Sequence, residues 1–202
     1  TTTSYNVGVD FGLFNNRIYL SADYYKKTTK DLLLKAPVSL ITGFANMMDN
    51  VGNVDNWGLE FELNTANITT NTFRWNSSLN ISLNRNKITS LGDDNSDIRS
   101  GQGNTIIQRV GNPINSYMLL RVDRTLRAAD FEADGVTPKP GIAIYTGQKP
   151  GDTKWVDVND DGKITSADYD VVGSYQPKFE WGFTNTFKYK NLDASILLQG
   201  RV

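Results

Sequence analysis

Strict alternation of apolar and polar residues is the feature that most constrains the fold of this chain. The alternation runs through six windows, at residues 5–14, 17–27, 57–66, 73–83, 179–189 and 192–200. On one phase of these windows 27 of 32 positions are apolar, against 5 of 30 on the other phase. A contrast of that size with a period of two predicts β-strands that have one apolar and one polar face.

The connections between these windows alternate between short and long. Asn15-Asn16, residues 67–72 and Lys190-Asn191 form the short connections, while residues 28–56 and 84–178 form the long ones. The windows have 9–11 residues, the length of a tilted transmembrane strand, whereas strands of soluble proteins are more often about 5–6 residues long. The pattern therefore predicts an all-β chain: about six strands of an antiparallel transmembrane β-barrel, with both long connections as extracellular loops.

Aromatic side chains gather near the ends of the windows, as in the interfacial belts of membrane barrels. Those near the short connections are Phe73, Trp75, Phe187 and Tyr189, and those near the long ones are Tyr5, Tyr24, Trp57, Phe179 and Trp181. A soluble β-sandwich that buries its apolar faces in a core would show the same alternation, with these aromatics in the core. The alternation leaves both folds open, and strand length with loop alternation favours the membrane barrel.

Composition excludes several kinds of chemistry. The chain has no His and no Cys, so it contains no imidazole base, no His-based triad and no thiolate nucleophile. Its net charge of −1 gives no electrostatic footprint for nucleic acid. We therefore do not expect an enzyme. Since the chain opens on Thr1 and closes inside an apolar pattern, we expect it to be an internal piece of a longer protein.

Residues 157–168 form the sharpest local motif, a twelve-residue run that fits a calcium loop of the EF-hand type. Gly162 stands at position six, where the chain must turn sharply. The predicted calcium ligands are Asp157, Asn159, Asp161, the backbone carbonyl of Lys163, Thr165 and Asp168. Position twelve is Asp instead of Glu, and neither flank reads as a helix. The alternative is a turn that is merely polar; as a calcium loop, the motif is expected to have a structural role.

Four segments of the chain are distinctive: YNVGVDFGLFNNR at 5–17, DYYKKTTKDLL at 23–33, NVGNVDNWGLE at 50–60 and GNPI at 111–114. Together they resemble the SusC/RagA family of TonB-linked outer-membrane proteins of Bacteroidetes. The calcium-type loop and residues 150–152, 172–173, 177–179, 181–183 and 198–200 continue the resemblance to the end of the chain. No single segment is decisive, but their order and spacing are specific.

The resemblance implies that the chain is a section of the C-terminal half of a plugged, 22-stranded barrel. It also implies import of oligosaccharides or peptides, together with a SusD-like surface lipoprotein. TonB would act through a segment outside this chain, and outer-membrane lipid would surround the strands. The alternative function is a soluble, calcium-dependent β-sandwich, either a carbohydrate-binding or a dockerin-like module. A dockerin has two calcium loops with helices, whereas this chain has one loop without them.

Overall fold

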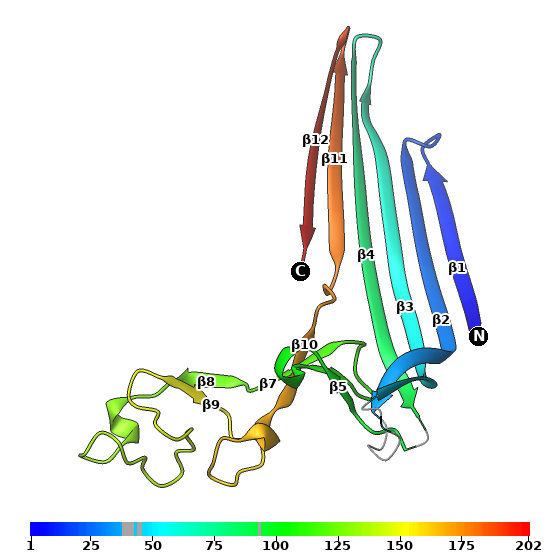
Figure 1. Cartoon of the computed structure of the whole chain (residues 1–202). Coiled ribbons are helices and arrows are strands. Elements are labelled where there is room, and N and C mark those ends of the chain that lie inside the picture. Colours follow the sequence, from blue (N-terminus) through cyan, green and yellow to red (C-terminus); the bar gives the residue numbers. More distant parts are fainter. Residues whose placement is uncertain (38–42, 44–45, 93) are drawn as a thin grey trace. The chain divides into compact units, whose positions relative to one another are not determined.

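A computed structural model describes residues 1–37, 43, 46–92 and 94–202. Its six longest strands form one antiparallel sheet in the order β1-β2-β3-β4-β11-β12 (Figure 1). Their bounds are β1 (Thr2–Leu13), β2 (Ile18–Pro37), β3 (Asn46–Thr69), β4 (Phe73–Leu91), β11 (Glu180–Tyr189) and β12 (Leu192–Arg201). The residues between β4 and β11 form an insertion, after which β11 pairs directly with β4.

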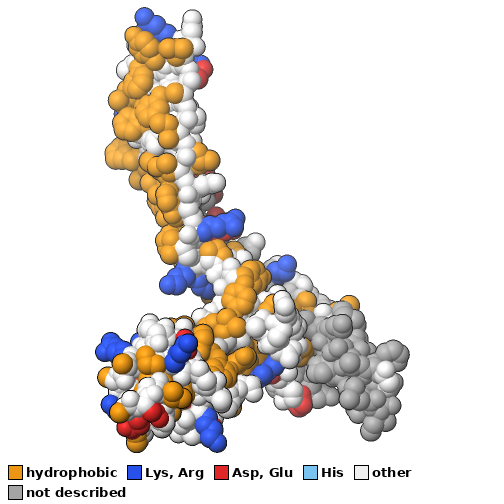
Figure 2. Space-filling view, turned by 60° about the vertical axis from the view of Figure 1, so that its left-hand side comes forward, with side chains coloured by type: hydrophobic (Ala, Val, Ile, Leu, Met, Phe, Trp, Pro, Cys, Tyr) orange, Lys and Arg blue, Asp and Glu red, His pale blue; other side chains and the backbone are white. Residues whose placement is uncertain are grey.

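The register of this sheet separates an apolar outer face from a polar face. Directly paired residues share a face, and the pairs Val9↔Ala22 and Leu63↔Leu79 belong to the outer face. Viewed as in Figure 2, hydrophobic side chains gather along one side of these strands and other side chains along the opposite side. The outer face is exposed: Tyr5 retains 69%, Val7 68% and Leu198 53% of its accessible surface. Such exposure does not fit the core of a soluble β-sandwich.

Each of the six predicted windows falls on one strand of this sheet, and three strands extend far beyond their windows. β2 continues to Pro37, β3 begins at Asn46 and β4 ends at Leu91. The predicted loop over residues 28–56 is therefore wrong for most of its length, and residues 38–42 and 44–45 lie outside the described residues. The alternation stops near Lys26, because residues 26–31 are all polar and Leu32, Leu33 and Leu34 are consecutive, whereas antiparallel backbone pairing continues. Alternation therefore predicted only the part of each strand that has one apolar face.

The chain divides into two compact units. Unit 1 comprises the sheet with residues 109–114, and unit 2 comprises residues 98–108 and 115–175. Unit 2 contains the short strands β5 (Ile98–Ser100), β6 (Ile106–Gln108), β7 (Ser116–Leu119), β8 (Val122–Thr125), β9 (Thr153–Trp155) and β10 (Asp170–Ser174). The 3₁₀ helices η2 (Gln102–Asn104), η3 (Ala128–Asp130) and η4 (Ser166–Asp168) lie between them. The predicted loop over residues 84–178 is wrong for residues 84–91, which belong to β4, and short-range pairing orders much of the rest.

Each unit has its own buried cluster. In unit 1, Val54, Ile88 and Leu91 are buried at the end of the sheet, where Ile88 N–H donates to the carbonyl of Asn112 at 3.0 Å. In unit 2 the buried apolar side chains are Ile98, Ile107, Met118, Leu126, Phe131, Ala143 and Ile164. Within the described residues, no helix has the length and apolar character needed to cross a membrane.

Candidate functional site

The polar face of the sheet brings four carboxylates together. Asp23 pairs with Glu60 across β2 and β3, and Glu62 lies one step further along β3. Asp10 of β1 pairs with Ser21, which in turn pairs with Glu62. Neighbouring polar groups donate to three of them: Tyr19 to Asp10 at 3.0 Å, Ser21 to Asp23 at 3.2 Å and Asn64 to Glu62 at 2.6 Å. The register, rather than proximity in sequence, gathers these side chains.

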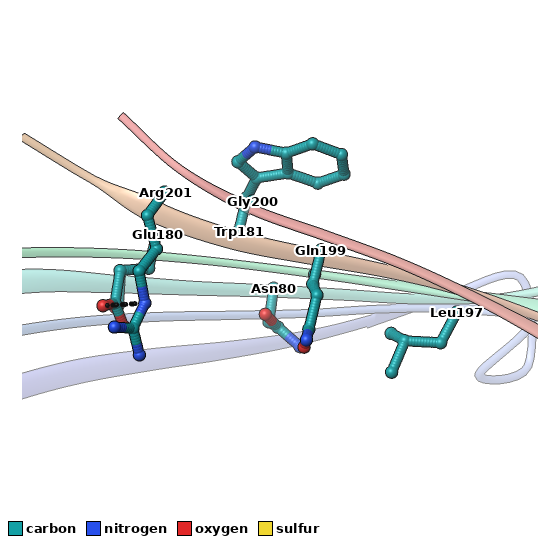
Figure 3. A pocket seen from close by; sticks show the side chains of 9 residues that line it. Asn80, Glu180, Trp181, Leu197, Gln199, Gly200 and Arg201 are labelled. Carbon is teal, nitrogen blue, oxygen red and sulfur yellow. Dashed lines mark ion pairs between the residues drawn. The ribbon is translucent and has the colours of Figure 1, made fainter. Parts of the chain in front are cut away.

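A pocket of about 700 Å³ lies on the other half of the sheet, over β4, β11 and β12. Its polar lining comes from Asn80, Ser82, Glu180, Gln199 and Arg201. Figure 3 shows Asn80, Gln199 and Leu197 on one side of the sheet, whereas Trp181 points to the opposite side. Amide and hydroxyl groups of this kind donate and accept hydrogen bonds with uncharged polar ligands.

Two contacts shape this pocket. Nε of Arg201 lies 2.9 Å from Oε1 of Glu180, so the two charges neutralise each other across β11 and β12 (Figure 3). Gly182 pairs with Asn80, and a Cβ atom at Gly182 would lie 2.9 Å from Oδ1 of Asn80. The missing side chain therefore leaves room for the amide of Asn80. The local sequence does not mark these residues as a pocket, because only the pairing of β11 with β4 and β12 places them side by side.

A polar network interrupts the apolar outer face near the short connections. Oδ1 of Asn185 accepts hydrogen bonds from Nε1 of Trp75 at 2.9 Å and from Oγ of Ser77 at 2.7 Å. Asn67 donates to Ser77 at 2.7 Å and accepts from Thr65 at 2.9 Å. These bonds link β3, β4 and β11, so polar groups on an apolar face are satisfied by one another.

In the calcium-type loop, the first three predicted ligands accept hydrogen bonds from the loop backbone. Oδ2 of Asp157 accepts from the N–H of Gly162 at 2.8 Å, and Oδ1 of Asn159 from that of Asp161 at 3.2 Å. Oδ1 of Asp161 accepts from the N–H of Lys163 at 2.9 Å. Gly162 has a φ of +80°, the left-handed conformation that the sharp turn requires. The loop is thus wound around its own side-chain oxygens.

Asp168 closes this loop from a fully buried position, with 0% of its surface exposed. Its carboxylate accepts from the N–H groups of Thr165 at 2.7 Å and Val158 at 2.9 Å. These bonds, chiefly that from Thr165, hold the pKa of Asp168 below its ordinary value. Among the described residues, no three His, Cys, Asp or Glu side chains form a group suited to a metal ion. An ion here would therefore need oxygens of Asn159, Thr165 and the Lys163 carbonyl, the hard donors that calcium accepts.

The long, two-faced strands and the exposed apolar face define a section of an outer-membrane β-barrel. Residues 1–184 match the family described as TonB dependent receptor-like, beta-barrel. The chain belongs to this family.

Relatives of known sequence lie in the same class. The chain is 37% identical over 206 residues to TonB-dependent receptor P26 of Formosa agariphila, covering 99% of this chain and 20% of that protein. It is 33% identical over 209 residues to TonB-dependent receptor SusC of Bacteroides thetaiotaomicron, covering 98% of this chain and 19% of that protein. The chain thus spans about a fifth of the length of these relatives.

Solved structures show the same fold. The RagAB peptide importer in its open-open state superposes with a TM-score of 0.76 at 22% identity, over 100% of this chain and 20% of that one. The structure of the RagAB peptide transporter gives a TM-score of 0.71 at 21% identity, over 98% and 20% of the two chains. The predicted SusC/RagA relationship, all-β barrel fold and outer-membrane location are confirmed.

Proposed function

We propose that the full-length protein imports oligosaccharides or peptides across the outer membrane, with energy supplied through TonB. The observation that carries this proposal is the polar face of the sheet, which would line the lumen. Its pocket over β4, β11 and β12 offers the amides of Asn80 and Gln199 and the hydroxyl of Ser82. Such groups bind sugar hydroxyls and peptide amides equally well, by hydrogen bonds that a passing ligand can exchange. Passage needs no covalent chemistry, so the protein is not an enzyme.

Two partners complete the proposal. A SusD-like surface lipoprotein would capture the ligand at the end of the barrel where the long connections lie, which we place outside the cell. TonB would contact a segment outside this chain. Support comes from SusC among the relatives and from RagAB, which is described as a peptide importer.

Uptake in the native cell tests this function. A strain lacking the full-length gene, complemented with the wild type or with Asn80→Ala/Gln199→Ala, would be grown on separate panels of oligosaccharides and peptides. We expect growth on one panel to require the wild-type gene and to slow in the double variant. Asn71→Ala/Gln102→Ala, which also removes two amides but at exposed positions away from the pocket, is the control. Unimpaired growth of the deletion strain on both panels would contradict the proposed import. Purification of the barrel without a lipoprotein would contradict the proposed partnership.

We also propose that residues 157–168 bind calcium as a structural clip within unit 2. Support comes from the oxygen-only donor set and from the winding of the loop around Asp157, Asn159 and Asp161. In this proposal Thr165, Asp168 and the carbonyl of Lys163 complete the coordination. Because a bound ion would hold together oxygens from both ends of the loop, loading should make the loop more resistant to proteases.

Limited proteolysis of the full-length protein, with calcium or with a chelator, tests this clip. We expect the chelator to speed cleavage within residues 150–175 in the wild type and to have no effect in Asp157→Ala. Asp134→Ala is the control, since Asp134 also accepts N–H bonds in a turn of unit 2 but lies outside the loop. Equal cleavage of the wild type in both conditions would refute calcium binding.

A further inference from the structure

The outer face changes character abruptly at the end of its apolar section. The apolar section extends from the level of Tyr24, Leu59 and Leu83 to the short connections. Within it, the described outer-face positions of the six strands include no charged side chain. At the next step along the strands, Lys26 pairs with Trp57, and Trp57 pairs with Arg85. One step further, Asp55 pairs with Lys87. Three cations thus stand together directly beyond the apolar section; Lys26, Arg85 and Lys87 are called the rim cations below.

These cations outnumber the acid on their own face. Asp55 is the one acidic side chain among the outer-face positions of these two steps. It accepts a hydrogen bond from Thr28 at 2.7 Å and lies 3.6 Å from Nζ of Lys26. Lys87 is exposed, and its ammonium has no ion-pair partner within the described residues. The rim therefore has an excess of two positive charges.

The opposite face of the same strands has a different charge pattern. Asp23 and Glu60 form a direct pair there, one step along the strands from the Tyr25↔Gly58 pair, and Lys27 is the cation of that face at the level of the rim. Cations are thus more numerous on the outer face of the rim than on the polar face, and this excess attracts an anion to the outer side of the sheet.

Aromatic side chains fix the depth of the rim. Tyr5 pairs with Lys26, and Trp57 lies between Lys26 and Arg85. Tyr and Trp at the edge of an apolar band occupy the headgroup level of a bilayer. Two residues of a strand advance about 6.6 Å, so the rim cations stand within one or two such steps of the hydrocarbon boundary, at the depth of lipid phosphates.

Because the outer face meets lipid in an outer-membrane barrel, we propose that Lys26, Arg85 and Lys87 bind the anionic, phosphate-bearing headgroup of a membrane lipid whose acyl chains lie along the apolar outer face. Lys26 and Lys87 supply mobile ammonium groups from either side of Trp57. Arg85 is held in place, because its Nη1 donates to the carbonyls of Asn84 at 2.8 Å and Pro177 at 3.3 Å. The site is distinct from the polar face and from the calcium-type loop.

Lipid retention by the full-length protein tests this site. The purified protein would be freed of native lipid, titrated with phosphatidylglycerol or with phosphatidylcholine of the same acyl chains, and examined by native mass spectrometry. We expect the wild type to prefer phosphatidylglycerol and Lys26→Gln/Arg85→Gln/Lys87→Gln to lose about tenfold in affinity. Lys26→Gln/Lys87→Gln, which keeps the backbone contacts of Arg85, should lose part of it and guards against a folding defect.

The control variant Lys27→Gln/Arg74→Gln/Lys188→Gln removes the same charge from the polar face and should retain the lipid as the wild type does. Equal retention by the wild type and both rim variants would overturn the proposal. So would an equal loss in the control, or a wild type that does not distinguish the two lipids. Displacement of phosphatidylglycerol by millimolar inorganic phosphate would also overturn the proposal, because the site would then bind a free anion and not a lipid. None of these outcomes depends on uptake of a nutrient.

Discussion

Gly58 illustrates how tightly a single position in the sheet can be constrained. A Cβ atom there would lie 2.5 Å from the carbonyl oxygen of Leu83 and 2.5 Å from ring atoms of Tyr25. The carbonyl belongs to the neighbouring backbone, so relief requires β3 and β4 to separate locally. We expect Gly58→Ala to destabilise the full-length barrel by about 1–3 kcal/mol, the usual cost of overpacking. The temperature at which the variant loses the gel mobility of the folded barrel, compared with that of the wild type, measures the change.

Gly8 provides the matched control for that substitution. Its Cβ atom would meet Oδ1 of Asp23, the end of a side chain that can rotate away. Gly8→Ala should therefore leave the unfolding temperature of the barrel nearly unchanged. Equal effects of the two substitutions would mean that the Leu83 carbonyl does not constrain Gly58.

Asp130 is the corresponding anchor in unit 2. Nη1 and Nη2 of Arg124 donate to its two oxygens at 2.6 and 2.7 Å, and the N–H of Arg127 donates at 2.7 Å. The guanidinium of Arg124, followed by that N–H, holds the pKa of Asp130 well below its usual range. A depressed carboxyl pKa stabilises the fold above the unfolded value of about 3.9, and this stabilisation is lost as the pH falls toward the folded value.

We therefore expect hydrogen exchange in residues 115–175, corrected for intrinsic rates, to quicken below about pH 4. Asp130→Asn should quicken exchange already at pH 7 and weaken the dependence on pH, whereas Glu132→Gln, at an exposed neighbouring position, should do neither. If Asp130→Asn showed the same hydrogen-exchange rates as the wild type at every pH, the Asp130 carboxylate would not stabilise unit 2.

At the scale of the element, Asn185 fastens two strands that are remote in sequence. Its carbonyl oxygen joins Trp75 and Ser77 of β4 to β11. Asn185→Ala leaves the indole N–H and the serine hydroxyl without this acceptor, which costs about 1–3 kcal/mol. Heat-resistant mobility of the barrel should fall accordingly. Thr186→Ala, on the exposed opposite face, is the control. A similar loss of barrel stability in both variants would mean that the lower strand propensity of Ala, and not the lost hydrogen bonds, causes the effect.

The same strands show what the sequence could and could not predict. Period-two alternation predicted all six strands because each has one apolar face, as in the contrast of Leu79 and Ser78. It missed the far halves of β2 and β3, because the polar run at residues 26–31 and the consecutive leucines at 32–34 do not alternate while backbone pairing continues. It also missed the pocket, since nothing local in β4 or β11 tells that Asn80 will face Gly182. The calcium-type motif was recognisable because its residues lie at fixed spacings within twelve consecutive positions, and its binding of calcium stays a prediction.

At the scale of the whole molecule, the two faces of the sheet should respond oppositely to the same new charge. Leu79 lies on the outer face between Leu63 and Phe183, and Ser78 lies next to it on the polar face between Asn64 and Thr184. An Arg side chain facing lipid near the bilayer midplane costs about 2–4 kcal/mol, whereas a lumen position keeps it in contact with water.

Leu79→Arg should therefore lower the fraction of full-length protein that reaches the outer membrane in its heat-modifiable, folded form. Ser78→Arg adds the same side chain one residue away and should leave that fraction close to the wild-type value. Fractionation of cells followed by electrophoresis of heated and unheated samples measures both. If Ser78→Arg proved the more damaging substitution, the outer and polar faces would have to be exchanged, and with them the proposed lumen wall and the lipid site at the rim.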